Sequence, residues 1–425
     1  MTAAQPAAEQ PGFFALLNRP ELGRPIIIQI VVMMGFGMAL PILPLYARSL
    51  GASIAAAGLF ASMFGLVRLA MDLGGGPLVD RFGERLIAPA GLAIYGVGTL
   101  VAGLAPTLPA AIFSWALGGA GSALFFAAQF SYVIKASPKE LMARVLSVFY
   151  ASFNAGLIAG GVLTGVIINF WGIAGPLRVY AVLLLGAAVL YRRVVPPVER
   201  RAEQEAEARE DIGAPQTKRF NGLLELFKTR GFFMVMLVQF SYMFMVTAIF
   251  DTLLPLFAKE SLEMSEAGVG FLFGIAIAAE LTVLYPTGLA ADRHGRRIVM
   301  IPGLIALIIT TSWLGLATVP AVLFVLVAFL GVASGIAGVP PGAMLADISP
   351  EGRSGTMVGA FRFVGDLAFF IGPLIAGSLA EVLGFRAAFL ACSVPLALAL
   401  AAVIRTPETS TLRGDKEASP MPALP

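Results

Sequence analysis

Long apolar runs recur along almost the whole chain, and short polar stretches separate them. A helix of roughly 20 apolar residues is long enough to cross the hydrocarbon core of a bilayer. The composition supports this interpretation, because 58% of the 425 residues are hydrophobic and only 13% are charged. An ordinary soluble domain carries about 25% charged residues. The sequence therefore predicts an all-α integral membrane protein.

Twelve such runs can be counted, six on each side of one long polar stretch. Their approximate limits are 25–47, 54–75, 86–105, 109–134, 144–170, 176–195, 231–257, 266–287, 298–317, 320–346, 356–380 and 385–404. We therefore expect two pseudo-symmetric six-helix bundles, at 25–195 and 230–404. The remaining segments are expected to be a cytoplasmic N-terminal segment at 1–24, a cytoplasmic linker with an amphipathic helix at 196–229, and a disordered cytoplasmic tail at 405–425.

The basic residues predict the orientation of the chain in the membrane. If both termini and the central linker share one side, that side holds 23 of the 29 Lys and Arg residues, because four lie on the other side and two lie inside spans. The four are Arg48, Arg178, Lys259 and Arg386. An excess of basic residues marks the cytoplasmic side. We therefore expect a multi-pass protein of the cell (inner) membrane with both termini in the cytoplasm.

A short charged loop between two apolar runs occurs twice, at an offset of 212 residues. The first copy is Gly76–Arg85 and the second is Gly288–Arg297, and both contain Gly, Asp-Arg, Gly and Arg at the same spacing. The same offset pairs, without a gap, Ser53 with Ser265, Gly58 with Gly270, Gly119 with Gly331 and Gly165 with Gly377. The chain thus repeats six spans in the same orientation. Such repeats pack about an axis along the membrane normal, with a binding site at their interface.

The repeated loop, the twelve spans and the long central stretch together resemble the major facilitator superfamily over roughly residues 15–405. Within this superfamily, the chain is most similar to the twelve-span drug:proton antiporters. The resemblance implies a major facilitator fold, transport by alternating access, and a cytoplasmic gate formed by both loops. The gate and motif residues that it implies are Gly76, Asp80, Arg81, Gly83, Arg85, Gly288, Asp292, Arg293, Gly295 and Arg297.

Three features depart from the antiporter pattern. Glu84 stands where the loop is usually basic, and Trp115 stands where antiporters often carry an arginine. The fifth span has Gly160-Gly161 but no Gly-Pro pair, whereas Gly372-Pro373 occurs in the eleventh span. These departures bear on proton-coupled antiport and not on membership of the superfamily.

Four charged residues inside spans predict a network between the two bundles. Arg68 and Asp72 lie one helical turn apart in the second span, as do Arg362 and Asp366 in the eleventh. The resemblance makes these spans antiparallel neighbours, and a rise of about 1.5 Å per residue then brings Arg68 level with Asp366 and Asp72 level with Arg362. Asp80 would face the N-terminal end of the eleventh span. The quartet is expected to be a conformational lock on the cytoplasmic side. The alternatives are a static packing bridge, local pairs one turn apart that never cross between the spans, or a set of substrate contacts.

Proton coupling requires a titratable group near the central cavity. The candidates are Glu280, Asp366, Asp72 and Asp251. A charged side chain inside a span costs about 2.5–3.5 kcal/mol on insertion scales, so each of these needs a partner, water or a proton. Glu280 is the first choice because no basic residue lies one turn away, and its pseudo-equivalent partner would be Asn154. The alternative is that Glu280 is a neutral structural side chain.

The resemblance implies that spans one, four, seven and ten line the cavity. The candidates for substrate contact are Gln29, Met33, Phe36, Phe126, Gln129, Phe130, Gln239, Tyr242 and Met243. Methionine and aromatic surfaces adapt to varied shapes, so such a wall suits lipophilic solutes. The alternative is that individual Met and Phe side chains pack against other helices or face lipid.

These patterns predict a secondary active transporter, with proton-coupled efflux of lipophilic organic compounds or drugs as the leading activity. The alternatives are uptake or facilitated transport of another organic solute or lipid, and a non-transporting membrane receptor or scaffold. The sequence carries no catalytic triad or phosphate-binding loop that would indicate an enzyme, and one histidine and one cysteine cannot form a metal site. We expect no cofactor and a monomeric state. The expected partners are a lipophilic small molecule, protons and membrane lipid, but not nucleic acid.

Overall fold

The computed structural model describes residues 18–137, 141–197, 230–348 and 354–408. Within these ranges the regular secondary structure is entirely helical. Nearly all of the linker expected at 196–229, including its amphipathic helix, lies outside the described residues, as do most of the expected N-terminal segment and tail.

The helices form two groups in chain order. The first contains α2 (Pro20–Ala39), α3 (Leu43–Ser49), α4 (Ile54–Phe82), α5 (Glu84–Leu104), α6 (Leu108–Ala136), α7 (Met142–Trp171) and α8 (Gly175–Val194). The second contains α11 (Arg230–Ala248), the π-helical turn η2 (Ile249–Leu253), α12 (Leu254–Glu260), α13 (Glu266–His294), α14 (Arg296–Leu314), α15 (Pro320–Gly338), α16 (Pro340–Ile348) and α17 (Ser354–Arg405).

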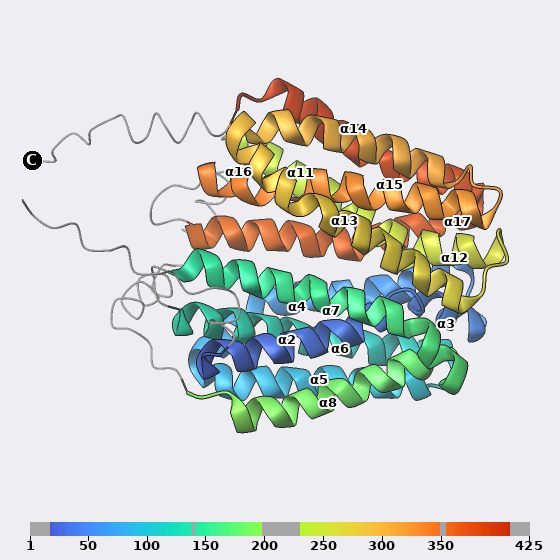
Figure 1. The fold of residues 1–425 in the computed structure, drawn as a ribbon. Coiled ribbons are helices and arrows are strands. Elements are labelled where there is room, and N and C mark those ends of the chain that lie inside the picture. Colours follow the sequence, from blue (N-terminus) through green and yellow to red (C-terminus); the bar gives the residue numbers. More distant parts are fainter. Residues whose placement is uncertain (1–17, 138–140, 198–229, 349–353, 409–425) are drawn as a thin grey trace, which may run out of the picture.

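The two groups lie side by side as bundles whose helices follow one common direction (Figure 1). Along the boundary between the bundles, α4 packs against α17 and α7 packs against α13. The start of α2 and the end of α17 lie at one end of the molecule, which we call the termini end. Helices α3 and α12 lie at the other end, which we call the opposite end.

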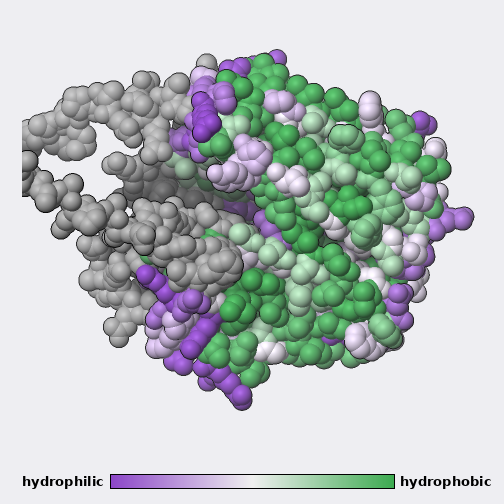
Figure 2. Space-filling view, viewed as in Figure 1, coloured by the Kyte–Doolittle hydropathy of each residue, from purple (hydrophilic) through white to green (hydrophobic). Residues whose placement is uncertain are grey.

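Apolar residues cover the middle of the molecule. Figure 2 shows this apolar zone, with hydrophilic residues gathered toward both ends. Large apolar side chains are strongly exposed on these helices, including Phe113 at 74%, Phe170 at 76% and Val382 at 80%. Such an extended apolar surface is unfavourable in water and is covered by lipid in a membrane-spanning protein.

Ten stretches among the described residues are long and apolar enough to cross a membrane. One of them, Gly359–Arg405, contains a break at Gly384, where φ is 82°, so that α17 folds into two limbs. Helix α8 lies among the others in Figure 1 but is less apolar, because it carries Arg178, Arg192 and Arg193. Counting α8 and the two limbs of α17 separately gives twelve long helical segments among the described residues, and the ten apolar stretches contain eleven of them.

The internal repeat is visible in local structure. Ser53 and Ser265, 212 residues apart, each cap the N-terminus of a long helix by accepting a hydrogen bond from a backbone N–H three residues on, at 3.2 and 3.1 Å. Gly83 and Gly295, at the same offset, have φ of 79° and 100°. Only glycine adopts such angles without strain, so both loops turn sharply at this glycine and start the next helix directly after it.

Candidate functional site

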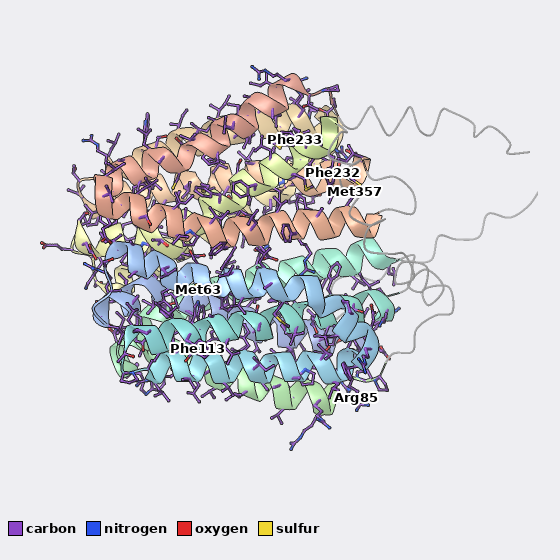
Figure 3. All side chains as sticks on the ribbon, turned by 180° about the vertical axis from the view of Figure 1, so that it is seen from behind. Met63, Arg85, Phe113, Phe232, Phe233 and Met357 are labelled. Atoms are coloured by element: carbon purple, nitrogen blue, oxygen red, sulfur yellow. The ribbon has the colours of Figure 1, made fainter. Side chains whose placement is uncertain are left out.

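Arg68 on α4 and Asp366 on α17 form an ion pair that joins the two bundles. The Arg68 Nε lies 3.0 Å from the Asp366 Oδ1, and 21% and 12% of the two side chains are exposed. The antiparallel packing of α4 on α17 brings these residues to the same level. In Figure 3, the labelled Met63 marks the stretch of α4 beside α17 that leads to Arg68.

Arg68 has two further neighbours on α6. Its Nη1 donates to Ser122 Oγ at 3.3 Å, and its guanidinium carbon lies 5.2 Å from the centre of the Phe126 ring. A guanidinium over an aromatic face is attracted by the ring quadrupole. One arginine is thus held by a carboxylate of the other bundle, by a hydroxyl and by an aromatic ring.

The other arm of the expected quartet is less fully described. Arg362 is half-buried on α17, one turn before Asp366. The Asp72 side chain lies outside the described residues, so the pairing of Asp72 with Arg362 stays a prediction. Asp80 is exposed at the termini end of α4, and its approach to the start of α17 also stays a prediction.

Each bundle contains an ion pair behind its charged loop, and the two pairs are related by the repeat. In the first bundle, Glu84 accepts hydrogen bonds from Lys135 and from Ser131, the latter at 2.6 Å. In the second bundle, Arg296 Nε lies 3.0 Å from Asp347 Oδ2. Glu84 and Arg296 are 212 residues apart, and so are Lys135 and Asp347. The pair is therefore kept in both bundles with its charges reversed, which explains why an acidic residue occupies a usually basic position.

The loop of the second bundle is also tied to the end of α17. Glu408 accepts hydrogen bonds from the backbone N–H groups of Arg296 and Arg297, both at 3.0 Å. Arg297 Nη2 donates to the Ile404 carbonyl at 2.6 Å, and Arg296 Nη2 lies 3.2 Å from Asp292 Oδ1. A carboxylate at a helix N-terminus satisfies free N–H groups and the helix dipole. Residues 405–408 are thus ordered, although we expected disorder from residue 405 onward.

Two polar contacts cross the boundary at the opposite end. Arg48 Nε lies 2.6 Å from Glu260 Oε1, joining α3 to α12. The backbone N–H of Ala55, at the start of α4, donates to Glu381 Oε2 of α17 at 2.7 Å. These bonds hold the two bundles together at this end.

The bundles also approach closely near these contacts. A Cβ atom added to Gly377 on α17 would lie 2.9 Å from the carbonyl oxygen of Ile54, so only glycine allows this packing of the backbones. The described conformation is therefore closed at the opposite end.

The acidic candidates sit in two different environments of the second bundle. Glu280 is half-buried on α13, and among the described residues its carboxyl has no hydrogen-bond or ion-pair partner. Nearby, the Tyr242 hydroxyl lies 2.9 Å from Ser334 Oγ. A Cβ atom on Gly335 would lie 2.9 Å from the Glu280 carbonyl, so α13 and α15 pack tightly there. Asp251 is only 3% exposed and lies in η2.

A family model described as Major Facilitator Superfamily matches residues 26–284 and 253–424. The chain belongs to this superfamily. A relative from Methanocaldococcus jannaschii, described as an uncharacterized transporter of the same type, is 23% identical over 361 residues, which is 84% of this chain and 90% of the relative. This chain is thus a multi-pass membrane transporter and not an enzyme.

Two further comparisons cover different extents. The quinolone resistance protein NorA of Staphylococcus aureus is 25% identical over 130 residues, which is 31% of this chain and 34% of NorA. The fold is shared with a bacterial homolog to the human lysosomal transporter Spinster, in an inward-facing and unoccupied conformation. The TM-score is 0.77 at 13% sequence identity, and the match covers 97% of this chain and 100% of the homolog's chain. The structure of this homolog in an inward-facing and occupied conformation has a TM-score of 0.74, and the match covers 90% of this chain and 95% of that chain.

The residues expected to contact substrate in this transporter fall into two groups. Phe126 lies beside Arg68, and the half-buried Phe36 ring lies 6.3 Å from the Phe64 ring, near the boundary between the bundles. Gln129, in contrast, is fully buried and donates to the Pro25 carbonyl at 2.8 Å, so it joins α6 to α2. The others that are fully or nearly buried are Gln29, Met33, Gln239 and Tyr242, and Phe130 and Met243 are partly buried.

Sequence reasoning missed several residues at the boundary. Phe64 on α4 stacks on Trp115 at 4.8 Å and lies 6.1 Å from Phe369 of the other bundle. Trp115 therefore packs inside the first bundle at a position where we had noted a departure from the antiporter pattern. Ser122 and Phe369 were passed over because a serine among glycines and a phenylalanine among apolar residues carry no signal by themselves.

Proposed function

We propose that this transporter exports lipophilic organic compounds by alternating access and that proton entry drives the export. The observation that carries the proposal is the Arg68–Asp366 ion pair, which joins the two bundles beside the Phe126 ring. An ion pair next to an aromatic wall suits a solute that is lipophilic and carries little charge. The partial similarity to NorA, which is described as a quinolone resistance protein, supports the same class of substrate.

In this proposal the Arg68–Asp366 pair is a conformational lock. Removing one partner of a buried ion pair costs about 3–5 kcal/mol, because the remaining charge is left without compensation. The pair here is partly exposed, at 21% and 12%, so we place its contribution at or below the lower end of that range. A proton on Asp366 would cancel the attraction without removing the side chain, and the bundles could then move relative to each other.

Glu280 is the proposed proton carrier. Its carboxyl has no ion-pair partner among the described residues. In this proposal, the carboxyl therefore gains or loses a proton according to the pH on the side of the membrane to which it is open. Asp366, Asp72 and Asp251 are the further candidates. We also propose that the termini end faces the cytoplasm, that the membrane is the cell (inner) membrane, and that the transporter works as a monomer with lipid around its apolar zone.

Proteoliposomes with an imposed pH gradient test the proposal. A lipophilic fluorescent substrate such as a quinolone should accumulate when the gradient is present, and collapse of the gradient by a protonophore should stop its accumulation. Glu280→Gln should abolish gradient-driven transport but leave exchange of substrate down its own gradient. Transport that ignores the pH gradient would favour facilitated movement of another organic solute or lipid. No transport of any solute by well-folded protein would favour a receptor or scaffold.

A further inference from the structure

Asp251 combines deep burial with an unsatisfied carboxyl oxygen. Its side chain is 3% exposed, and Oδ2 is shielded from solvent without a hydrogen-bond partner among the described residues. The neighbouring Thr252 hydroxyl is buried without a partner as well. An ionised carboxylate in such a place is strongly unfavourable, whereas a neutral carboxylic acid costs far less.

The local backbone is specialised around Asp251. The turn η2 is π-helical, and π-helical turns inside α-helices are rare and often occur at functional sites. The residue 212 positions earlier is Ala39, the last residue of α2, so the repeated scaffold provides an alanine at the equivalent place. The repeated scaffold therefore does not require a carboxyl here, and only the second bundle carries one at this position.

The position of η2 connects this carboxyl to movement of the bundles. The turn packs against α11, α12 and α17 of its own bundle and against α3 and α4 of the other bundle. It thus lies where the bundles meet at the opposite end, which is closed in this conformation.

Several charged groups on these packed elements have other partners, and Arg386 on α17 is exposed. Arg48 pairs with Glu260, and Glu381 accepts from a backbone N–H of α4. Lys259 lies 2.6 Å from Glu266, and Arg68 on α4 pairs with Asp366 on α17. Helix α11 carries no charged residue between Gly231 and Ala248. Among the described residues, none of these contacts compensates a charge on Asp251.

We propose that Asp251 is a proton-binding site that controls the opposite end: its carboxyl holds a proton while the bundles are closed there and releases it when they separate. The O–H bond breaks as water enters between the bundles, the proton passes to that water, and the carboxylate is then solvated. This proposal deepens the proton coupling proposed above and rests on it. It assigns Asp251 to opening and closing, and Glu280 to carrying the proton.

Distances between spin labels across the opposite end test this assignment. The native Cys392 is the only cysteine and is buried, so Cys392→Ala gives a background without reactive thiols. Ser49→Cys and Ser261→Cys then place labels on two exposed residues, the last residue of α3 and the residue directly after α12. In the full-length protein in lipid nanodiscs without substrate, the short-distance fraction should fall as pH rises. The ratio of closed to open forms should change by up to about tenfold per pH unit, the limit for one proton.

The variants separate the two carboxyls. Asp251→Asn and Asp251→Ala, the latter copying Ala39, should both keep the distance short at every pH. Glu280→Gln in the same background should retain the pH response while losing gradient-driven transport. A pH response that survives in both Asp251 variants, or a parent protein whose distances ignore pH, overturns the role of Asp251. Failure of the proposed function appears separately, as transport in the parent that does not depend on the pH gradient.

Discussion

Arg48 and Glu260 lie 2.6 Å apart, Nε to Oε1, and are separated in sequence by 212 residues. This separation equals the offset of the internal repeat, so the two residues occupy the same place in their respective bundles. Equivalent residues can touch only close to the axis that relates the two bundles. The ion pair therefore marks where this axis leaves the molecule at the opposite end, and the repeat carries an arginine in one copy and a glutamate in the other.

Arg48→Gln should weaken the closure of the opposite end. The side chains are 37% and 27% exposed, and exposed pairs contribute about 0.2–1 kcal/mol. We therefore expect the closed population to fall by up to about fivefold relative to the open one. The distance between labels at Ser49 and Ser261 measures this shift. Exchanging the charges, with Arg48→Glu and Glu260→Arg together, should restore closure, and a double variant that stays open would contradict an ion-pair role.

Lys135→Ala should destabilise the first bundle, because Glu84 would keep a buried charge without its main partner. Both side chains are 11% exposed, and breaking such a pair costs about 3–5 kcal/mol. The Tm in detergent should fall clearly.

The second bundle supplies the matched control. Glu84→Arg combined with Lys135→Asp copies the Arg296–Asp347 pair, so this double variant should recover most of the lost Tm. Equal Tm values for the single and double variants would show that the pair does not stabilise the bundle.

Glu408→Ala should loosen the start of α14. The carboxylate accepts two backbone hydrogen bonds there, both at 3.0 Å, and a helix cap contributes about 0.5–2 kcal/mol. Hydrogen exchange should become faster at Arg296 and Arg297 and stay unchanged at the start of α5. Glu408→Gln keeps the acceptor oxygen but loses the charge, so it should give an intermediate exchange rate. Unchanged exchange in Glu408→Ala would rule out the capping role.

Asp366→Asn should release the proposed lock while preserving the fold. The amide keeps the shape of the carboxyl but loses the attraction to Arg68, so transport should lose its dependence on pH and fall by about tenfold or more if the lock contributes at least 1.4 kcal/mol. Transport assays in proteoliposomes and the Tm should be measured on the same sample. Wild-type turnover and coupling in this variant would leave the pair as a static packing bridge. A lower Tm with normal coupling would support the same conclusion.

Several features could be predicted from the sequence because they depend on residues that are close together in the chain. The long apolar runs predict membrane helices. The fixed offset between Gly76–Arg85 and Gly288–Arg297 predicts two bundles of the same design. The matching depth of Arg68 and Asp366 in the membrane could be estimated as well. Every α-helix rises by a constant distance per residue, and the family resemblance makes the two helices antiparallel neighbours.

Other features could not be predicted, because they depend on how helices from distant parts of the chain pack. Lys135 meets Glu84 across a separation of 51 residues. The repeat could have indicated this pair, because the charge is reversed between the two copies both at Glu84 and Arg296 and at Lys135 and Asp347. Glu408 was assigned to a disordered tail because no local pattern marks a residue that caps a helix 111 residues away.

The sequence by itself determined that this protein spans a membrane, that it is built from two copies of one bundle, and which loops repeat. The hydropathy and the length of each apolar run determine whether it can cross a bilayer. The repeat is visible because matching glycines recur at one fixed offset. Only the tertiary structure decided that the opposite end is closed, that Arg48 meets Glu260, and that Asp251 is buried in a π-helical turn with no partner for Oδ2 among the residues that the structure describes. Each of these features depends on how helices from distant parts of the chain pack against one another. A shift of one helix by one residue would change which side chains meet.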